Sequence, residues 1–132
     1  MADTIKLNII TPERKAYEGE VIDLTTENDI GRLEILPNHV PMVTSIVPTV
    51  TTFTTVDGKK LKLFTSTGVL KIEKNELNLL SEDVEWPQEI DVKRAEEAKK
   101  KAEQLLREKE NIDYRRAELK LKRALARLRT KD

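Results

Sequence analysis

Apolar and polar residues alternate with a period of two along much of the first 80 residues. The segment Ile5-Lys6-Leu7-Asn8-Ile9 is the first example. Because successive side chains of a strand point to opposite faces, this pattern predicts strands with one buried face. The same alternation recurs at Ile22–Leu24, Leu33–Ile35, Leu61–Leu63, Leu70–Ile72 and Leu77–Leu79.

Turn residues separate these predicted strands. Asp57-Gly58 predicts a hairpin because its turn requires positive φ, and Lys74-Asn75-Glu76 predicts a second tight turn. The stretch from Ile35 to Val56 lacks Asp, Glu, Lys and Arg but contains three prolines and many threonines, so it predicts β structure and loop rather than a membrane span. Many short strands at this spacing predict a mainly β domain over residues 1–87, an antiparallel β-sandwich or flattened barrel.

From Ile90 onward the pattern changes to that of helices. This part contains no Gly or Pro and is rich in Ala, Glu, Lys, Arg and Leu. Asn111 or Asp113 can cap a second helix, so residues 88–132 are expected to form a two-helix αα-hairpin able to rearrange about the joint at Glu110–Asp113. The two apolar stripes, with steps of mostly three or four, are Val92, Ala95, Ala98, Ala102, Leu105 and Leu106, then Ala117, Leu121, Ala124, Leu125 and Leu128.

Charge divides unequally between the two parts of the chain. The 24 Lys and Arg residues balance the 24 Asp and Glu residues overall. Residues 1–89 hold 9 basic and 15 acidic residues, whereas residues 90–132 hold 15 basic and 9 acidic residues. This asymmetry predicts that the basic end binds an acidic partner.

Residue types needed for catalysis are scarce. The chain has no Cys, one His, no Walker-type glycine loop and no Gly-x-Ser-x-Gly elbow, which argues against the common nucleophile, metal and nucleotide-hydrolysis sites. His39 lies between Pro37 and Pro41 and is interpreted as a hydrogen-bonding loop residue. We therefore expect no catalytic residue, no metal and no catalytic cofactor. Met1–Thr4 shows no leader pattern, so the product is expected to stay in the compartment where it is made.

The segment from Tyr114 to Lys131 is strongly basic, with eight Lys and Arg residues and Glu118 as its one acid. It fits three interpretations: the nucleic-acid-binding arm of a free-standing adaptor, a surface that binds an acidic protein, or a solvated helix face. The acidic first part of the chain and the shortage of stacking aromatic residues favour an acidic protein over nucleic acid.

The segment Gly31-Arg32-Leu33-Glu34-Ile35-Leu36-Pro37-Asn38-His39-Val40-Pro41-Met42 resembles the signature loop of the epsilon-subunit family of bacterial F-type ATP synthases, Gly-x-Leu-Gly-Ile-Leu-Pro-Gly-His-x-Pro-Leu/Met. Thr11-Pro12-Glu13, Gly68–Ile72 and the Ile90 start of the tail follow in family order, so the resemblance covers nearly the whole chain. Glu34 and Asn38 stand where the family usually has Gly. Asn tolerates the left-handed conformation, whereas Glu34 implies extended backbone.

The resemblance implies a ten-stranded β-sandwich followed by two helices. In that family the sandwich binds the central stalk (gamma) subunit and the membrane ring of c subunits, at the cytoplasmic face of the bacterial cell membrane, so contact with the membrane is indirect. The positions implied in rotor contact are Gly31, Arg32, Pro37 and His39.

The family's helical tail either folds as a hairpin or extends up the stalk, where its basic residues meet the catalytic beta subunits and the alpha subunits and block hydrolytic rotation. The resemblance therefore implies a regulatory and coupling subunit rather than an enzyme. The positions that correspond to these basic contacts are Lys120, Lys122, Arg123 and Arg127.

The hairpin geometry predicts an anion site. If the turn is centred near residues 110 and 111, antiparallel helices place residue i roughly beside residue 221 − i, so Arg94 faces Arg127 and Arg123 lies one turn away. Three converging cations repel one another unless an anion binds among them, and a triphosphate would convert that repulsion into charge-assisted hydrogen bonds.

The resemblance points to the same ligand, because some bacterial members of the family bind ATP as a regulatory ligand. Lys101 stands where those ATP binders have Arg, and its ammonium group lacks the bidentate fork, so a lower affinity is expected. A second interpretation stays open, in which Asp91 and Asp113 cap their helices and the basic residues form a solvated face. The positions implied in ATP binding are Glu85, Ile90, Asp91, Arg94, Lys101, Arg123 and Arg127.

Overall fold

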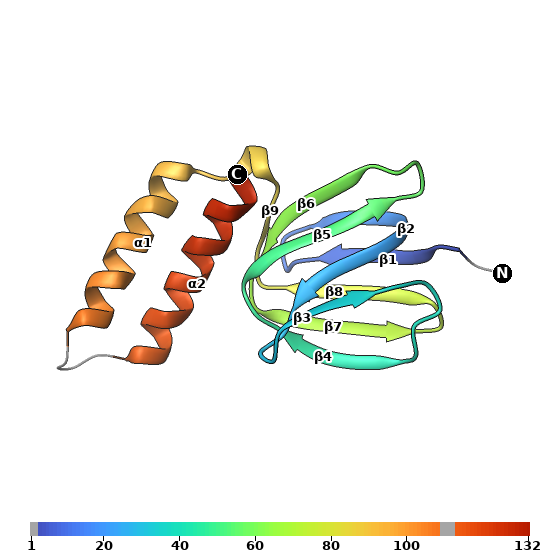
Figure 1. The fold of residues 1–132 in the computed structure, drawn as a ribbon, viewed down its shortest axis with the longest axis horizontal. Helices are drawn as coiled ribbons and strands as arrows, with labels where there is room; N and C mark the ends of the chain where they lie inside the picture. Colours follow the sequence, from blue (N-terminus) through green and yellow to red (C-terminus); the bar gives the residue numbers. More distant parts are fainter. Residues whose placement is uncertain (1–2, 109–112) are drawn as a thin grey trace.

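The computed structural model describes residues 3–108 and 113–132. Its first part is a β-sandwich and its second part is a pair of helices beside one end of that sandwich (Figure 1). The strands are β1 Ile5–Ile10, β2 Lys15–Glu27, β3 Arg32–Ile35, β4 Met42–Ile46, β5 Thr49–Thr55, β6 Lys60–Thr65, β7 Gly68–Glu73, β8 Glu76–Ser81 and β9 Val84–Glu85.

The strands pair in the order β4-β7-β8-β1-β2-β5-β6-β9, and β3 pairs with β2. Strand β2 pairs with β1 up to Val21 and with β3 from Leu24 onward, and a register shift between Val21 and Asp23 separates the two parts. An irregularity of this kind bends a strand and lets it contribute to both layers. The order has two free ends, β4 and β9, so the sheet is not closed into a barrel.

Two details of the predicted sheet are wrong. The described residues contain nine strands rather than ten, and the segment between β3 and β4, which holds the left-handed Asn38 between Pro37 and Pro41, is not a strand. The sheet is also not wholly antiparallel, because β1 pairs with β8 in parallel.

The local predictions for the loops are confirmed. Lys74 and Asn75 have φ of 51° and 55°, as the two-residue turn between β7 and β8 requires. Gly58 has a φ of 88° in the turn between β5 and β6. Glu34 lies inside strand β3, whereas Asn38 has a φ of 65°. The replacement of two family glycines therefore follows from the backbone conformation at each position.

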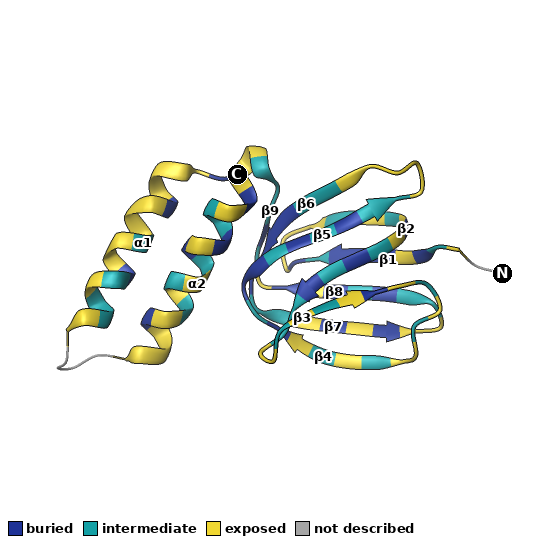
Figure 2. Cartoon of the chain, viewed as in Figure 1, coloured by how far each residue is buried: buried dark blue, intermediate teal, exposed yellow. Residues whose placement is uncertain are grey.

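The sandwich has its own hydrophobic core, built from strand residues alone. Buried positions alternate along the strands, as the sequence pattern predicts (Figure 2). Partly buried side chains of the strands, and Trp86 of the connection after β9, pack against this core. Its buried members are Ile5, Leu7, Ile9, Val21, Leu24, Ile35, Ile46, Phe53, Leu63, Leu70, Ile72, Leu77, Leu79 and Val84.

A short 3₁₀ helix, η1 (Pro87–Glu89), connects the sandwich to the helices. Arg14, in the turn between β1 and β2, donates to both carboxylate oxygens of Glu89 at 2.9 and 2.7 Å and to the carbonyl of Val84 at 3.0 Å. Glu89 also accepts the backbone N–H of Trp86 at 2.8 Å. These bonds tie the connecting segment to the sandwich.

The helices are α1 (Val92–Arg107) and α2 (Tyr114–Lys131). Helix α2 lies between α1 and the sandwich (Figure 1). Ala95 and Ala102 are buried on α1, and Ala117, Ala124 and Ala126 are buried on α2. Small side chains let the two backbones approach closely. Neither described helix has the length and apolar character needed to cross a bilayer. The predicted joint at Glu110, Asn111 and Ile112 lies outside the described residues.

Candidate nucleotide site and contact surfaces

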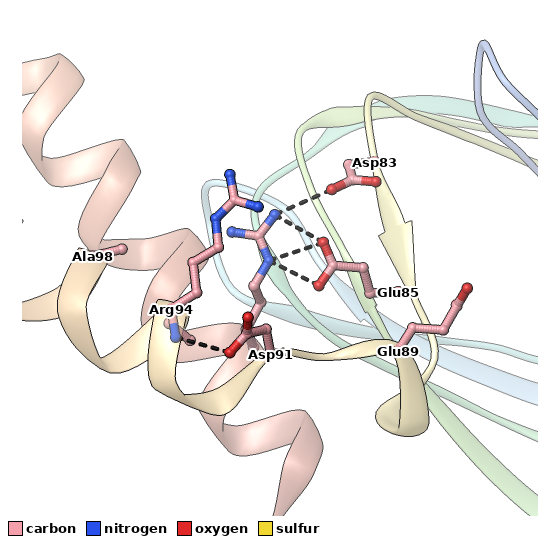
Figure 3. A pocket seen from close by; sticks show the side chains of 8 residues that line it. Asp83, Glu85, Glu89, Asp91, Arg94 and Ala98 are labelled. Atoms are coloured by element: carbon pink, nitrogen blue, oxygen red, sulfur yellow. Dashed lines mark hydrogen bonds and ion pairs between the residues drawn. The ribbon is translucent and has the colours of Figure 1, made fainter.

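A cavity of about 350 Å³ lies between the sandwich and the two helices. Arg94 comes from the first turn of α1 and Arg127 from α2, so both helices and the end of the sandwich build one site (Figure 3). This volume is in the range of small-ligand pockets. The lining residues are Asp83, Glu85, Glu89, Asp91, Arg94, Ala95, Ala98 and Arg127.

Ile90 and Asp91 begin the helical part and have distinct roles. Ile90 is buried against Phe64 and Ala126, so its side chain joins the sandwich to α2. Asp91 is the N-cap of α1, and its side chain accepts the N–H of Arg94 at 3.0 Å. Asp113 caps α2 in the same way, through the N–H of Arg116 at 3.2 Å. The capping interpretation is therefore confirmed for both aspartates.

Arg127 is held from the sandwich side. Its Nε donates to both oxygens of Glu85 at 3.1 Å, and its Nη2 donates to Asp83 Oδ2 at 3.1 Å. Its guanidinium carbon lies 4.5 Å from the centre of the Phe64 ring, within cation–π range. The charge at this position is thus compensated by carboxylates and an aromatic face.

Arg123 and Lys101 lie beside this cavity rather than in it. They line a neighbouring groove of about 250 Å³ together with Lys120 and Arg127, over a floor that includes Ala98, Ala102 and Leu105. Arg123 also donates from Nε to the Ser66 hydroxyl at 3.3 Å and lies 3.6 Å from Glu82. Arg127 belongs to both hollows, so the cations gather along one continuous surface.

The electrostatics of the cavity differ between its carboxylates. Burial raises the pKa of Glu85, the nearby Asp83 raises it further, and Arg127 opposes both effects. The Glu89 pKa is lowered, chiefly by the hydrogen bond from Arg14 and then by the Trp86 backbone N–H. Glu89 is therefore a stable anion, whereas negative charge on Glu85 is less favourable.

The four positions implied in rotor contact lie between β2 and β4. Arg32 donates to the Thr49 hydroxyl at 3.3 Å and to the Val50 carbonyl at 3.4 Å, so its side chain is tied to β5. The half-buried His39 has its Nδ1 2.7 Å from the carbonyl of Val40, which agrees with a hydrogen-bonding loop residue. Gly31 immediately precedes β3, and Pro37 lies two residues after its end.

The basic residues predicted to contact catalytic subunits divide between two environments. Lys120 and Lys122 are exposed. Arg123 and Arg127 have 30% and 26% exposed side chains and face carboxylates of the sandwich. In this folded arrangement, half of the set is engaged within the chain.

Sequence reasoning missed the sandwich residues that receive these arginines. Phe64 and Ser66 lie at the end of β6, and Glu82 and Asp83 lie between β8 and β9. The acidic run at residues 82, 83 and 85 was the available signal. Its partners were not identifiable, because they lie more than 40 residues away along the chain.

Comparisons with known proteins agree on one family. Residues 4–87 match the family model "ATP synthase, Delta/Epsilon chain, beta-sandwich domain", and residues 88–132 match "ATP synthase, Delta/Epsilon chain, long alpha-helix domain". A relative from Clostridium kluyveri named "ATP synthase epsilon chain" is 52% identical over 128 residues, which is 97% of each chain. One of the same name from Clostridium botulinum (strain Okra) is 48% identical over 132 residues, 100% of this chain and 99% of its own.

Two solved structures share the fold. A chain in the Euglena gracilis mitochondrial ATP synthase structure of OSCP, F1 and c-ring superposes with a TM-score of 0.84 and 17% identity, covering 98% of this chain and 81% of its own. A chain in the Tetrahymena thermophila central stalk and c-ring structure gives a TM-score of 0.62 and 14% identity, covering 96% of both chains.

Proposed function

The chain belongs to the delta/epsilon chain family of ATP synthase, and from this premise we propose that it couples the stalk to the ring and regulates the enzyme without catalysing a reaction itself. The relatives named epsilon chain match it over nearly its full length. The rival interpretation, a free-standing adaptor with a nucleic-acid-binding arm, is not favoured by these relatives.

In this proposal the sandwich binds the central stalk (gamma) subunit and the c ring, at the cytoplasmic face of a bacterial membrane. Apolar side chains exposed around the loop at residues 28–43 support such a contact, because monomeric surfaces rarely gather many of them. Ile30 is 91% exposed, Val40 70% and Val43 66%. Gly31, Arg32, Pro37 and His39 would contact the rotor within this region.

The helices would inhibit ATP hydrolysis when they leave the sandwich and extend toward the alpha and beta subunits. Lys120 and Lys122 are free to meet an acidic surface in either state, whereas Arg123 and Arg127 become available only on release. The positive charge of the tail, which would complement an acidic surface of those subunits, supports this role.

Nucleotide sensing is the part of the function that the geometry supports best, and the cavity lined by Arg94 and Arg127 is the observation that carries it. We propose that ATP binds there and stabilises the folded hairpin. The phosphates would bind Arg94 and Arg127 and extend toward Arg123 and Lys101, and Glu85, Ile90 and Asp91 would surround the nucleoside. Because both helices and the sandwich build the site, a ligand that binds it opposes their separation.

Calorimetry on the isolated subunit tests this proposal. We expect saturable ATP binding that weakens about tenfold or more in Arg127→Ala, because a charge-assisted bond to phosphate is lost. Asp91→Ala is expected to weaken binding as well. Its matched control is Asp113→Ala, which removes an equivalent cap from α2 without touching the cavity.

If Asp113→Ala weakens ATP binding as much as Asp91→Ala, helix capping explains both results. If the natural sequence gives no binding heat at millimolar ATP, the sensing function is refuted.

A further inference from the structure

The guanidinium of Arg127 is occupied by a pair of sandwich carboxylates, Asp83 and Glu85, which we call the carboxylate pair. Nε donates to Glu85, and Nη2 lies 3.1 Å from an oxygen of each carboxylate. Figure 3 shows these contacts at the cavity that Arg94 also lines. The Arg127 guanidinium, which is suited to bind phosphate, therefore already has anionic partners.

A phosphate group that reaches Arg127 must come close to this pair. Phosphate and carboxylate oxygens favour the same donors of a guanidinium, and both are anionic. Like charges in one partly buried site repel one another. The pKa of Glu85 is raised chiefly by burial and further by the neighbouring Asp83, so additional negative charge at this site is unfavourable. Nucleotide phosphates and the carboxylate pair thus compete for a single cation.

The two carboxylates contact Arg127 to different extents. Glu85 is 23% exposed and offers both oxygens to Arg127, whereas Asp83 is 45% exposed and offers one. The other oxygen of Asp83 accepts the N–H of Val84 at 2.9 Å, which keeps the side chain ordered in the loop between β8 and β9. Asp83 is the weaker contact and is the one a phosphate displaces first.

We propose that Asp83 is an internal competitor of the nucleotide, which docks α2 through Arg127 when the site is empty and gives up that contact when phosphate binds. The inference rests on the proposed nucleotide site and adds a residue to it that sets its affinity. Negative charge at residue 83 lowers nucleotide affinity while it supports the folded hairpin, so the ligand replaces an existing tether instead of creating one.

The Asp83→Asn variant tests the proposal, because it keeps the shape of the side chain and removes its charge. Calorimetry with ATP at pH 7 is expected to give about three- to tenfold tighter binding, the size of one weakened charge-assisted contact. The matched control is Asp29→Asn, which removes the same charge from an exposed turn outside the cavity and is expected to leave affinity within about twofold. Equal or weaker binding by Asp83→Asn overturns the competition.

A second measurement follows docking without nucleotide. The chain lacks Cys, so spin labels at Lys59→Cys and Glu118→Cys report one distance between the β5–β6 turn and α2. In Asp83→Asn we expect more of the population at long distance, and added ATP restores the short one. An unchanged distribution overturns the tethering role. If the natural sequence itself gives no binding heat with ATP, both the nucleotide site and the competition are refuted. That outcome differs from equal binding by the two sequences, which refutes the competition alone.

Discussion

At the level of single residues, Gly68 is the glycine with the least space around it. A Cβ added there would lie 1.9 Å from the carbonyl oxygen of Leu80 and 2.9 Å from the Cα of Ser81. Both contacts are with the backbone of β8, which cannot move aside as a flexible side chain can. Gly68 thus allows β7 to lie against the end of β8, where it pairs with Ser81.

Gly68→Ala is therefore expected to lower the free energy of unfolding by about 3 kcal/mol or more, as severe overpacking does. Gly58→Ala is the comparison, since a Cβ there meets no atom within 4 Å but the φ of 88° disfavours a side chain. We expect it to cost about 1 kcal/mol. Thermal unfolding followed by circular dichroism measures both. A larger loss in Gly58→Ala would show that backbone conformation outweighs the contact with β8.

At the level of elements, the Arg14–Glu89 pair fixes the segment that leads into the helices. It holds η1 against the sandwich together with the Glu89 contact to Trp86, whose ring lies 6.4 Å from that of Phe53. After Glu89, the chain is held by packing of Ile90 and by helix contacts. A release of the hairpin is expected to pivot between residues 89 and 92.

The same pair gives a pH dependence whose sign follows from the lowered pKa of Glu89. A carboxyl with a lowered native pKa stabilises the fold above its ordinary pKa and loses that contribution as the pH falls through the native value. Glu89→Gln is therefore expected to be less stable than the natural sequence at pH 7, by a difference that shrinks as the pH falls toward 3. Because the pair is about 40% exposed, the difference at pH 7 is about 1 kcal/mol or less.

Urea unfolding between pH 3 and 7 measures this difference. Glu13→Gln removes one exposed charge from the β1–β2 turn that carries Arg14 and serves as the control. A Glu89→Gln difference that does not change with pH contradicts the assignment to the ion pair.

At the level of the whole molecule, the sandwich and the helices contribute unequally to folding. The main core contains residues from the strands alone, whereas the smaller cluster of Phe64, Ile90 and Ala126 joins the two parts. Removing the helices exposes Phe64 but leaves the main core intact. The sandwich is therefore expected to fold without them.

A chain that ends at Glu89 is expected to keep a cooperative unfolding transition, with a lower midpoint because Phe64 loses its cover. In a reconstituted ATP synthase it is expected to retain stalk binding and to raise ATP hydrolysis several-fold, because the basic helices are missing. Hydrolysis assays over a range of ATP concentrations measure the effect. Unchanged hydrolysis contradicts the inhibitory role, and an unfolded truncated chain contradicts the independence of the core.

Local features of this protein follow from the sequence because they depend on neighbouring residues. Alternation identified six strand segments between Ile5 and Leu79, whereas β4 and β5 were covered only by the expectation of β structure and loop. The loss of Gly and Pro after Ile90 indicated the helices, and Asp91 and Asp113 were among the predicted caps. The turn at Lys74-Asn75 was readable as well. The period of a strand or helix and the φ of a turn are fixed within a few residues.

Pairing between distant residues was decided only by the tertiary structure. The parallel pairing of β1 with β8 brings together segments about 70 residues apart, and no local pattern specifies it. The buried Thr26, Thr51 and Thr65 read as ordinary strand threonines, yet their hydroxyls form a chain with spacings of 2.9 and 2.8 Å across three strands. Burial obliges each hydroxyl to find a partner, and the register of the sheet determines which one.

The candidate site combines both kinds of information. Helix period and the expected turn brought Arg94 and Arg127 to one cavity, which a hairpin of two regular helices requires. The sequence could not assign Asp83 and Glu85 to Arg127, because that contact depends on how the hairpin docks on β9. The sequence determines which cations the chain carries. Which carboxylates neutralise those cations depends on distances that only the packed structure sets.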